Sequence, residues 1–215
     1  MITTSTTVQP RRRSTRARLA VAITGAVVAA LALAGCSSSS NDQLTNQYGK
    51  GTTQNYISGD GAVTEVAADK RSAPVTFSAT TDDGDHVSSA ALKGKVVVLN
   101  FWYAGCPPCR AEAKYLNQSY GTFQGKDVAF VGVNVRDRKP TAQAFERTFR
   151  TAYGSVLDAD HGTMQLALSG TIAPNSVPTT IVLDKQGRVA ARVLGAVDSS
   201  SIIDTLVSDE LNGNA

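Results

Sequence analysis

The sequence lacks several features that mark common classes of protein. It has no net positive charge beyond residue 35: without the five arginines that precede this point, 16 basic residues remain against 18 acidic ones. That balance argues against a partner made of nucleic acid. There is no internal repeat and no sign of a second domain. The 215 residues therefore indicate one domain of ordinary size behind a leader.

Histidine and cysteine are also scarce, with 2 and 3 residues respectively. His86 and His161 lie far apart and form no His-x₃₋₅-His pair, which argues against a zinc site, so we expect no metal. Three cysteines would leave one odd thiol in an exported chain. The apolar stretch at residues 19–34 is short for a transmembrane span and has the length of a secretory signal segment.

The leader ends in a motif that accounts for the odd cysteine. The arginines precede the apolar stretch, which finishes Leu33-Ala34-Gly35-Cys36. That ending resembles a bacterial lipobox, in which the cysteine is lipidated and becomes the new N-terminus. A lipidated Cys36 would anchor the protein on the extracytoplasmic face of the bacterial cell membrane, where disulfides form. A plain signal peptide or an uncleaved anchor is the alternative.

These features predict three parts of the chain. Residues 1–35 are a lipoprotein signal peptide, residues 36–61 the lipidated cysteine and a flexible tether, and residues 62–215 the folded domain. The tether is rich in Ser, Asn, Gln, Thr and Gly, a composition typical of flexible spacers. The arginine run at residues 11–13 hints at a twin-arginine signal, so the export route stays open between that and the general one.

The other two cysteines lie where a strand gives way to a helix. Residues 96–99 are apolar and β-branched, and a helical pattern runs from residue 109 to about 120. A helix start has unpaired N–H groups and partial positive charge, and both favour a thiolate. This position predicts thiol–disulfide exchange, with Cys106 as the exposed attacking thiolate and Cys109 as the more buried resolving thiol. A static structural disulfide is the alternative.

The rest of the chain alternates between strand and helix patterns. Further strands are expected at residues 128–134, 179–184 and 189–194, and further helices at about 141–153, 162–168 and 199–211, the last capped by Asp198. Short strands at residues 62–66, at 75–78 and at Val87, with a turn at 82–85, predict an added N-terminal β-hairpin. The order predicts an α/β fold with a mixed central β-sheet flanked by helices.

That order, with Cys-x-x-Cys opening the first helix, resembles the thioredoxin fold. Residues 97–102 with 106–112 resemble the active-site segment of the TlpA/ResA-like group of membrane-tethered proteins. Residues 176–180 resemble that group's cis-proline segment, and residues 184–187 resemble its hairpin. The resemblance covers about residues 74–211.

The resemblance implies roles for several residues. Pro178 would have a cis bond after Val177 and form the wall opposite the cysteines, so it is assigned to the catalytic site. The residues implied to bind substrate are Trp102, Val177 and Thr179. Glu112 is a candidate proton relay, although a surface carboxylate near the positive end of a helix is the favoured interpretation.

Two departures from the family pattern stand out. Gly105 replaces the usual tryptophan before the first cysteine, which would open the site to a larger partner. Asn100 replaces the buried acid of thioredoxins proper, as it does in many members of the TlpA/ResA-like group.

The implied function is a membrane-anchored thiol–disulfide oxidoreductase, monomeric and needing no cofactor beyond the Cys106–Cys109 disulfide. It would reduce exported proteins such as apocytochrome c with electrons from a membrane thiol donor. The reverse activity, a dithiol oxidase, stays open. A peroxiredoxin-like peroxidase is a further alternative, although Tyr103 occupies the threonine position of its Thr-x-x-Cys motif. The last alternative is a non-catalytic binding module with vestigial cysteines.

Overall fold

The computed structural model describes residues 60–170 and 176–213, which belong to the compact unit Thr52–Ala215. The predicted signal peptide, Cys36 and most of the predicted tether lie outside these ranges. A six-stranded mixed sheet runs in the order β1-β8-β7-β4-β5-β6. Its strands are β1 (Asp60–Glu65), β4 (Val96–Trp102), β5 (Val128–Asn134), β6 (Ser155–Leu157), β7 (Thr179–Leu183) and β8 (Val189–Gly195).

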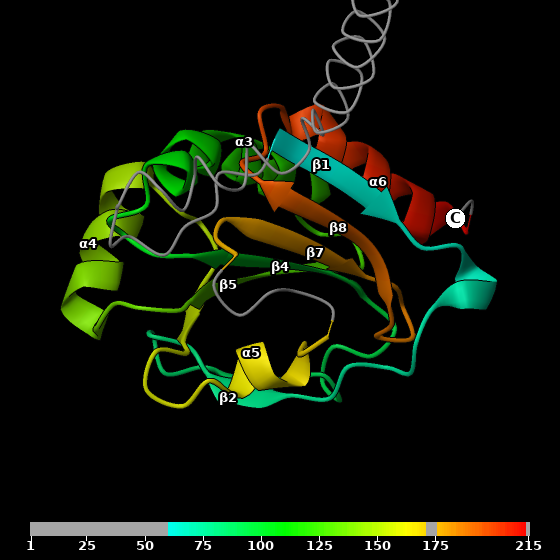
Figure 1. Cartoon of the computed structure of the whole chain (residues 1–215), viewed down its shortest axis with the longest axis horizontal. Coiled ribbons are helices and arrows are strands. Elements are labelled where there is room, and N and C mark those ends of the chain that lie inside the picture. Colours follow the sequence, from blue (N-terminus) through cyan, green and yellow to red (C-terminus); the bar gives the residue numbers. More distant parts are fainter. Residues whose placement is uncertain (1–59, 171–175, 214–215) are drawn as a thin grey trace, which may run out of the picture. The chain divides into compact units, whose positions relative to one another are not determined.

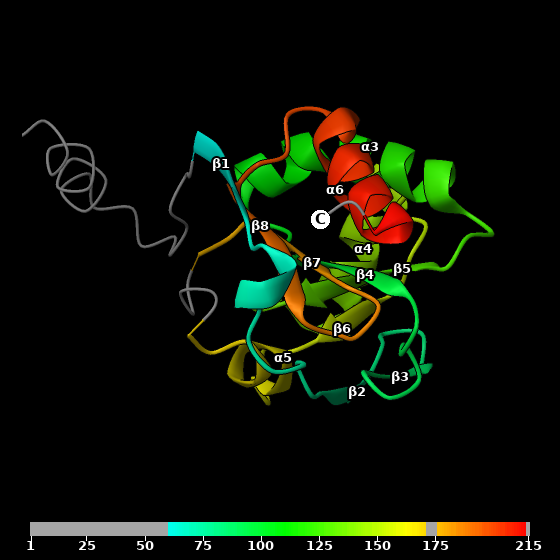
Figure 2. The same cartoon turned by 90° about the vertical axis from the view of Figure 1, so that its right-hand side faces the viewer.

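Two layers cover the sheet, as Figures 1 and 2 show. One face packs against α3 (Pro107–Phe123) and α6 (Ser200–Asn212), and α4 (Lys139–Phe149) lies beside α3. The other face carries α5 (Thr163–Ala167) and a small two-stranded sheet of β2 (Ser78–Thr80) and β3 (His86–Ser88). The 3₁₀ turn η1 (Ala68–Lys70) follows β1. The predicted mixed α/β architecture is therefore confirmed.

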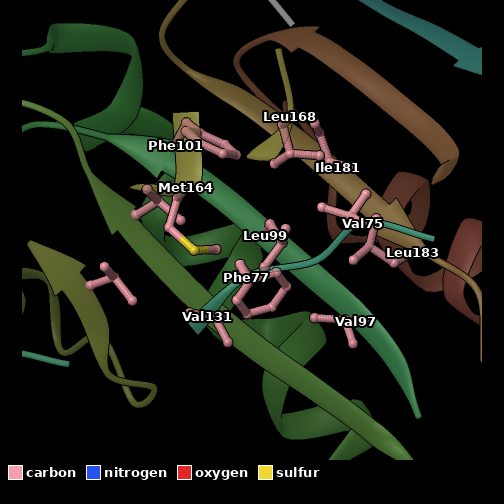
Figure 3. Close-up of a cluster of buried hydrophobic side chains, with 12 residues drawn as sticks. Val75, Phe77, Val97, Leu99, Phe101, Val131, Met164, Leu168, Ile181 and Leu183 are labelled. Carbon is pink, nitrogen blue, oxygen red and sulfur yellow. The ribbon is translucent and has the colours of Figure 1, made fainter. Parts of the chain in front are cut away.

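Strand β4 lies in the middle of the sheet, and all of its residues are buried. It runs parallel to β5 and antiparallel to β7. Alternate side chains point to opposite faces of a strand, and Val97, Leu99 and Phe101 pack on the face of β2, β3 and α5 (Figure 3). Val96 and Val98 pack on the face of α3 and α6. The C-terminal end of this buried strand, and the cysteines that follow it, therefore lie at the edge of both layers.

Several predicted elements are confirmed with changes. The N-terminal hairpin exists as β2 and β3, but the first predicted strand, β1, instead pairs with β8 at the sheet edge. Helix α4 ends at Phe149 because Arg150 adopts a left-handed conformation, with φ 55°, and donates its N–H to Glu146. The cap of α6 is Ser199, whose hydroxyl accepts the Ser201 N–H, so the prediction of Asp198 as cap was wrong.

Strand β6 was not predicted. Its three residues are too few to show a strand pattern in the sequence, and they are ordered by parallel pairing with β5. Among the residues that the structure describes, no helix has the length and apolar character needed to cross a membrane.

A buried ion-pair network joins the N-terminal segment to the sheet and to α6. The Arg71 guanidinium donates to Asp184 at 3.0 Å and to Glu210 at 2.7 Å, with only 3% of its side chain exposed. Its Nε donates to the Val66 carbonyl at 2.8 Å. Burial by itself raises the pKa of Asp184, but hydrogen bonds from the Arg188 backbone and from Arg71 outweigh it and hold that pKa below its usual range.

Replacing Arg71 should therefore destabilise the fold. Arg71→Ala leaves buried Glu210 without its partner and removes one of the two guanidiniums that pair with Asp184, which should lower the free energy of unfolding by about 3–5 kcal/mol. Urea unfolding measures this. The control is Lys70→Ala, because the Lys70 side chain is 75% exposed and pairs with Asp69, which is 72% exposed; it should change stability by less than about 0.5 kcal/mol. Equal effects of the two changes would contradict the prediction.

Candidate active site

The two cysteines lie where β4 ends and α3 begins, as predicted. Cys106 is the N-cap of α3, with Pro107 and Pro108 in the first turn. It forms a disulfide with Cys109, and their Cα atoms are 5.3 Å apart. The Cys109 N–H also points at Cys106 Sγ, 3.2 Å away. The helix start therefore presents an N–H donor to the first sulfur, an arrangement that stabilises a thiolate when the disulfide is reduced.

Cys106 is more deeply buried than the sequence suggested. Its exposed fraction is 0%, against 2% for Cys109, so the expectation of an exposed first cysteine was wrong for the oxidised pair. Both sulfurs belong to one apolar cluster, whose other buried members are Trp102, Tyr103, Ala113, Ala142, Phe145 and Val177. Attack on Cys106 Sγ thus requires movement of the groups around it.

The residues expected to bind substrate are all buried, and two of them lie in the cysteine cluster. The Val177–Pro178 bond is cis, as predicted, and Val177 packs in the cysteine cluster. Trp102 lies in the same cluster, buried, with its ring centroid 4.3 Å from that of Phe145. Thr179 does not share this position: it is fully buried, and its hydroxyl donates to the Ser176 carbonyl at 2.9 Å. The Thr179 side chain therefore has no surface to offer a substrate.

Glu112 lies in the interior, so the favoured interpretation of a surface carboxylate was wrong. It sits one turn beyond Cys109 on the side of α3 that faces the sheet, and it is 1% exposed. Its carboxylate accepts from Asn100 Nδ2 at 2.9 Å and from the Val197 N–H at 3.0 Å. Burial raises the pKa of Glu112 to about 8, although both hydrogen bonds lower it. Glu112 of α3 therefore contacts Asn100, and Asn100 occupies the strand position at which thioredoxins proper carry a buried acid.

A small space lies beside Cys109 and borders Asn100, the hydrogen-bond partner of Glu112. It measures about 10 Å³ and is lined by Cys109, Asn100 and Tyr153, among others. One water needs about this much room. Burial raises the pKa of Tyr153 far above its ordinary value, and the negative charges of Glu112 and Glu146 add to the effect. Tyr153 therefore keeps its proton.

A carboxylate that the sequence did not reveal holds the loop before Cys106. Asp137, in the turn after β5, accepts the Ala104 N–H at 2.6 Å. Asn134 orients Asp137 by donating from Nδ2 at 2.9 Å and by accepting the Asp137 N–H at 2.7 Å. The only available signal was an Asn-x-x-Asp spacing at the end of an expected strand, which is too common to identify such a contact.

Gly105 is exposed, and its surroundings leave room for a side chain. A Cβ atom built there would lie 3.4 Å from Cε2 of Tyr103, an ordinary contact. A Cβ atom is therefore tolerated at this position. Within residues 60–170 and 176–213, no three His, Cys, Asp or Glu residues are grouped so that they could hold a metal ion.

Comparisons with known proteins agree with this geometry. The AhpC/TSA family matches residues 70–192. The chain is 33% identical to the thiol-disulfide oxidoreductase ResA of Bacillus subtilis over 122 residues, which are 57% of this chain and 65%, just under two thirds, of that relative. A DsbF homologue from Corynebacterium diphtheriae is 33% identical with a TM-score of 0.63, covering 74% of this chain and 99% of its own.

A second solved structure is similarly close. The secreted thiol-disulfide isomerase of Corynebacterium glutamicum is 30% identical with a TM-score of 0.62, and the match covers 71% of this chain and 94% of that one. These matches confirm the resemblance to ResA and the thioredoxin fold of the described domain.

The buried carboxyl should make stability depend on pH. The folded pKa of Glu112 is about 8 and its ordinary value is 4.5, so the folded protein binds more protons between those limits. The free energy of unfolding is then highest below a pH of 4.5 and is lowered as the pH rises through about 8, the pKa of Glu112 in the folded protein. Glu112→Gln should lack this loss, which amounts to on the order of 2–4 kcal/mol between pH of about 5 and about 9.

Denaturant unfolding at the two pH values measures the difference. Glu65→Gln is the matched control, because Glu65 is an exposed carboxylate on β1. That variant should keep the wild-type dependence on pH. The same dependence in Glu112→Gln would show that another group is responsible.

Proposed function

This chain belongs to the AhpC/TSA family, and on that premise we propose that it is an extracytoplasmic thiol–disulfide oxidoreductase, anchored to the membrane by a lipid on Cys36. One observation carries the proposal: a Cys106–Cys109 disulfide caps a helix above a buried carboxylate, in one cluster with the residue before a cis proline. The likeness to ResA and to the two secreted corynebacterial proteins supports it.

The proposed exchange proceeds in two steps. In the dithiol form, the Cys106 thiolate attacks a sulfur of a client disulfide, the client S–S bond breaks, and the released client thiolate takes a proton. Cys109 then loses its proton and attacks Cys106 Sγ, which breaks the mixed disulfide and releases the second client thiol. Two electrons have moved to the client, and a membrane thiol donor must restore the dithiol.

Glu112 is the proposed acceptor of the Cys109 proton. It lies one turn beyond Cys109, and the small space beside Cys109 borders Asn100, its hydrogen-bond partner. A proton acceptor works best when its pKa lies near the operating pH, and the pKa of Glu112 is about 8. The carboxylate is therefore suited to take a proton in one half of the cycle and to return it in the other.

The resemblance to the TlpA/ResA-like group supports the reducing direction, with apocytochrome c as the client class. The oxidising direction is the second candidate, because the helix N–H groups and the nearby Arg110 favour the Cys106 thiolate and so stabilise the reduced form. The reduction potential separates the two. A value near about −270 mV supports the reductase, and one near about −120 mV supports the oxidase.

Replacing the resolving cysteine should trap the client. Cys109→Ser leaves the Cys106 mixed disulfide with no intramolecular thiol to release it, so client proteins should accumulate in bands that disappear on reduction. Mass spectrometry of the trapped bands identifies them. Cys106→Ser is the control and should trap none, because it lacks the attacking thiolate. A Cys109→Ser protein that is expressed and folded but traps no client would count against the proposal.

The chain should not act as a peroxidase. Buried Tyr103 stands where a peroxiredoxin carries the threonine of Thr-x-x-Cys, and Cys106 already pairs with a cysteine in the next turn. In the presence of a regenerating dithiol, hydrogen peroxide should disappear no faster than with the dithiol alone. A peroxiredoxin assayed in parallel is the positive control, and consumption at its rate would favour the peroxidase function instead.

A further inference from the structure

Positive charge gathers beside the disulfide. Residues 136–150 carry five basic and two acidic residues, whereas the rest of the chain from Cys36 onward carries 11 basic and 16 acidic ones. This segment comprises the turn after β5 and helix α4. It adjoins the active-site loop, because Asp137 binds the Ala104 N–H. The basic segment therefore borders the cysteines of an otherwise acidic domain.

Two arginines in this region are held by aromatic rings. The guanidinium of Arg136 lies 4.3 Å from the centre of the Tyr103 ring. That of Arg110 lies 5.0 Å from the centre of the Phe149 ring and donates to the Ala104 carbonyl at 3.3 Å. Stacking restricts a guanidinium while leaving N–H groups at its edge for other partners. Both arginines are exposed, and both contact the loop that leads into Cys106, Arg110 at Ala104 and Arg136 at Tyr103.

Ion pairing within the fold does not account for the charges of Arg110 and Arg136. Neither arginine makes an ion pair with a carboxylate in the described part of the chain. The nearby Asp137 is already engaged by Ala104 and Asn134. Arg138 and Lys139 stand at the start of α4, where the helix end is itself positive and the first turn has no acid. Cations at that end are unfavourable for the helix.

We propose that Arg110 and Arg136 bind aspartate or glutamate side chains of the client polypeptide next to its reactive cysteine. This inference rests on the proposed function, because it assigns the client of the same disulfide. The planar guanidinium matches a carboxylate with two parallel hydrogen bonds. An anionic membrane surface is the less suitable partner, because lipid at the two arginines would cover the loop that precedes Cys106.

The test uses two disulfide peptides that differ only beside their cysteines. One carries Asp and Glu there, and the other carries Asn and Gln. Each turnover reduces one peptide disulfide to a dithiol and oxidises Cys106 and Cys109 of the reduced protein to their disulfide. At low salt the acidic peptide should react about tenfold faster, and the difference should shrink as ionic strength rises.

Arg110→Gln combined with Arg136→Gln should reduce this preference to about twofold or less. The ratio of the two peptide rates is the readout, because a changed Cys106 thiolate would alter both rates alike. Lys126→Gln is the matched control. Lys126 also stacks on an aromatic ring, 4.9 Å from the centre of Phe123, but at the far end of α3. This variant should keep the wild-type preference.

Each other outcome overturns a definite part of the inference. Equal wild-type rates would overturn the acidic client while leaving thiol–disulfide exchange intact. Loss of the preference in Lys126→Gln as well would show that overall charge, not the two arginines, is responsible. Reaction with neither peptide would overturn the proposed function, and the inference with it. Binding to phosphatidylglycerol vesicles through the two arginines, with loss of peptide exchange, would assign the surface to the membrane.

Discussion

The contact between Glu112 and its two donors is the constraint on which the active site depends. Burying a carboxylate is costly unless hydrogen bonds compensate, and here the compensation comes from Asn100 on β4 and from the Val197 N–H ahead of α6. Asn100 is fixed in turn by donating to Thr180 on β7. One carboxylate therefore ties α3 to the central strands. Because Cys106 and Cys109 lie in the first turn of that helix, their position above the sheet follows.

A second layer of polar contacts supports the site from below. Trp102 donates from its indole nitrogen to Ser155 Oγ on β6 at 3.2 Å. The contact needs a glycine on β5, because a Cβ atom at Gly132 would clash with Ser155 Oγ. Burial raises the pKa of the neighbouring Glu146 to about 7, with Asp82 and Asp83 adding to the shift. The small edge strand β6 thus positions the aromatic residue beneath the cysteines.

The sequence was most informative where a signal is local. Apolar runs identified β4, β5 and β7, and the Cys-x-x-Cys spacing at a strand end located the disulfide. The sequence was least informative where a residue is surrounded by residues that are distant in the chain. Glu112 accepts from a backbone N–H 85 residues away, so nothing in the helical pattern showed that it faces inward. Strand β6 and the Asp137 contact were missed for the same reason.

The electrostatic surroundings of the two sulfurs differ in a way that orders the proposed exchange. Cys106 meets the N–H groups of the α3 start, with the Arg110 and Arg136 guanidiniums near its loop, so its thiolate is favoured. Cys109 lies within the first turn of α3, one turn before buried Glu112. The apolar surroundings disfavour a second thiolate there. Cys109 therefore keeps its proton until Cys106 has formed a mixed disulfide with the client. Cys106 is then the sulfur that attacks the client disulfide.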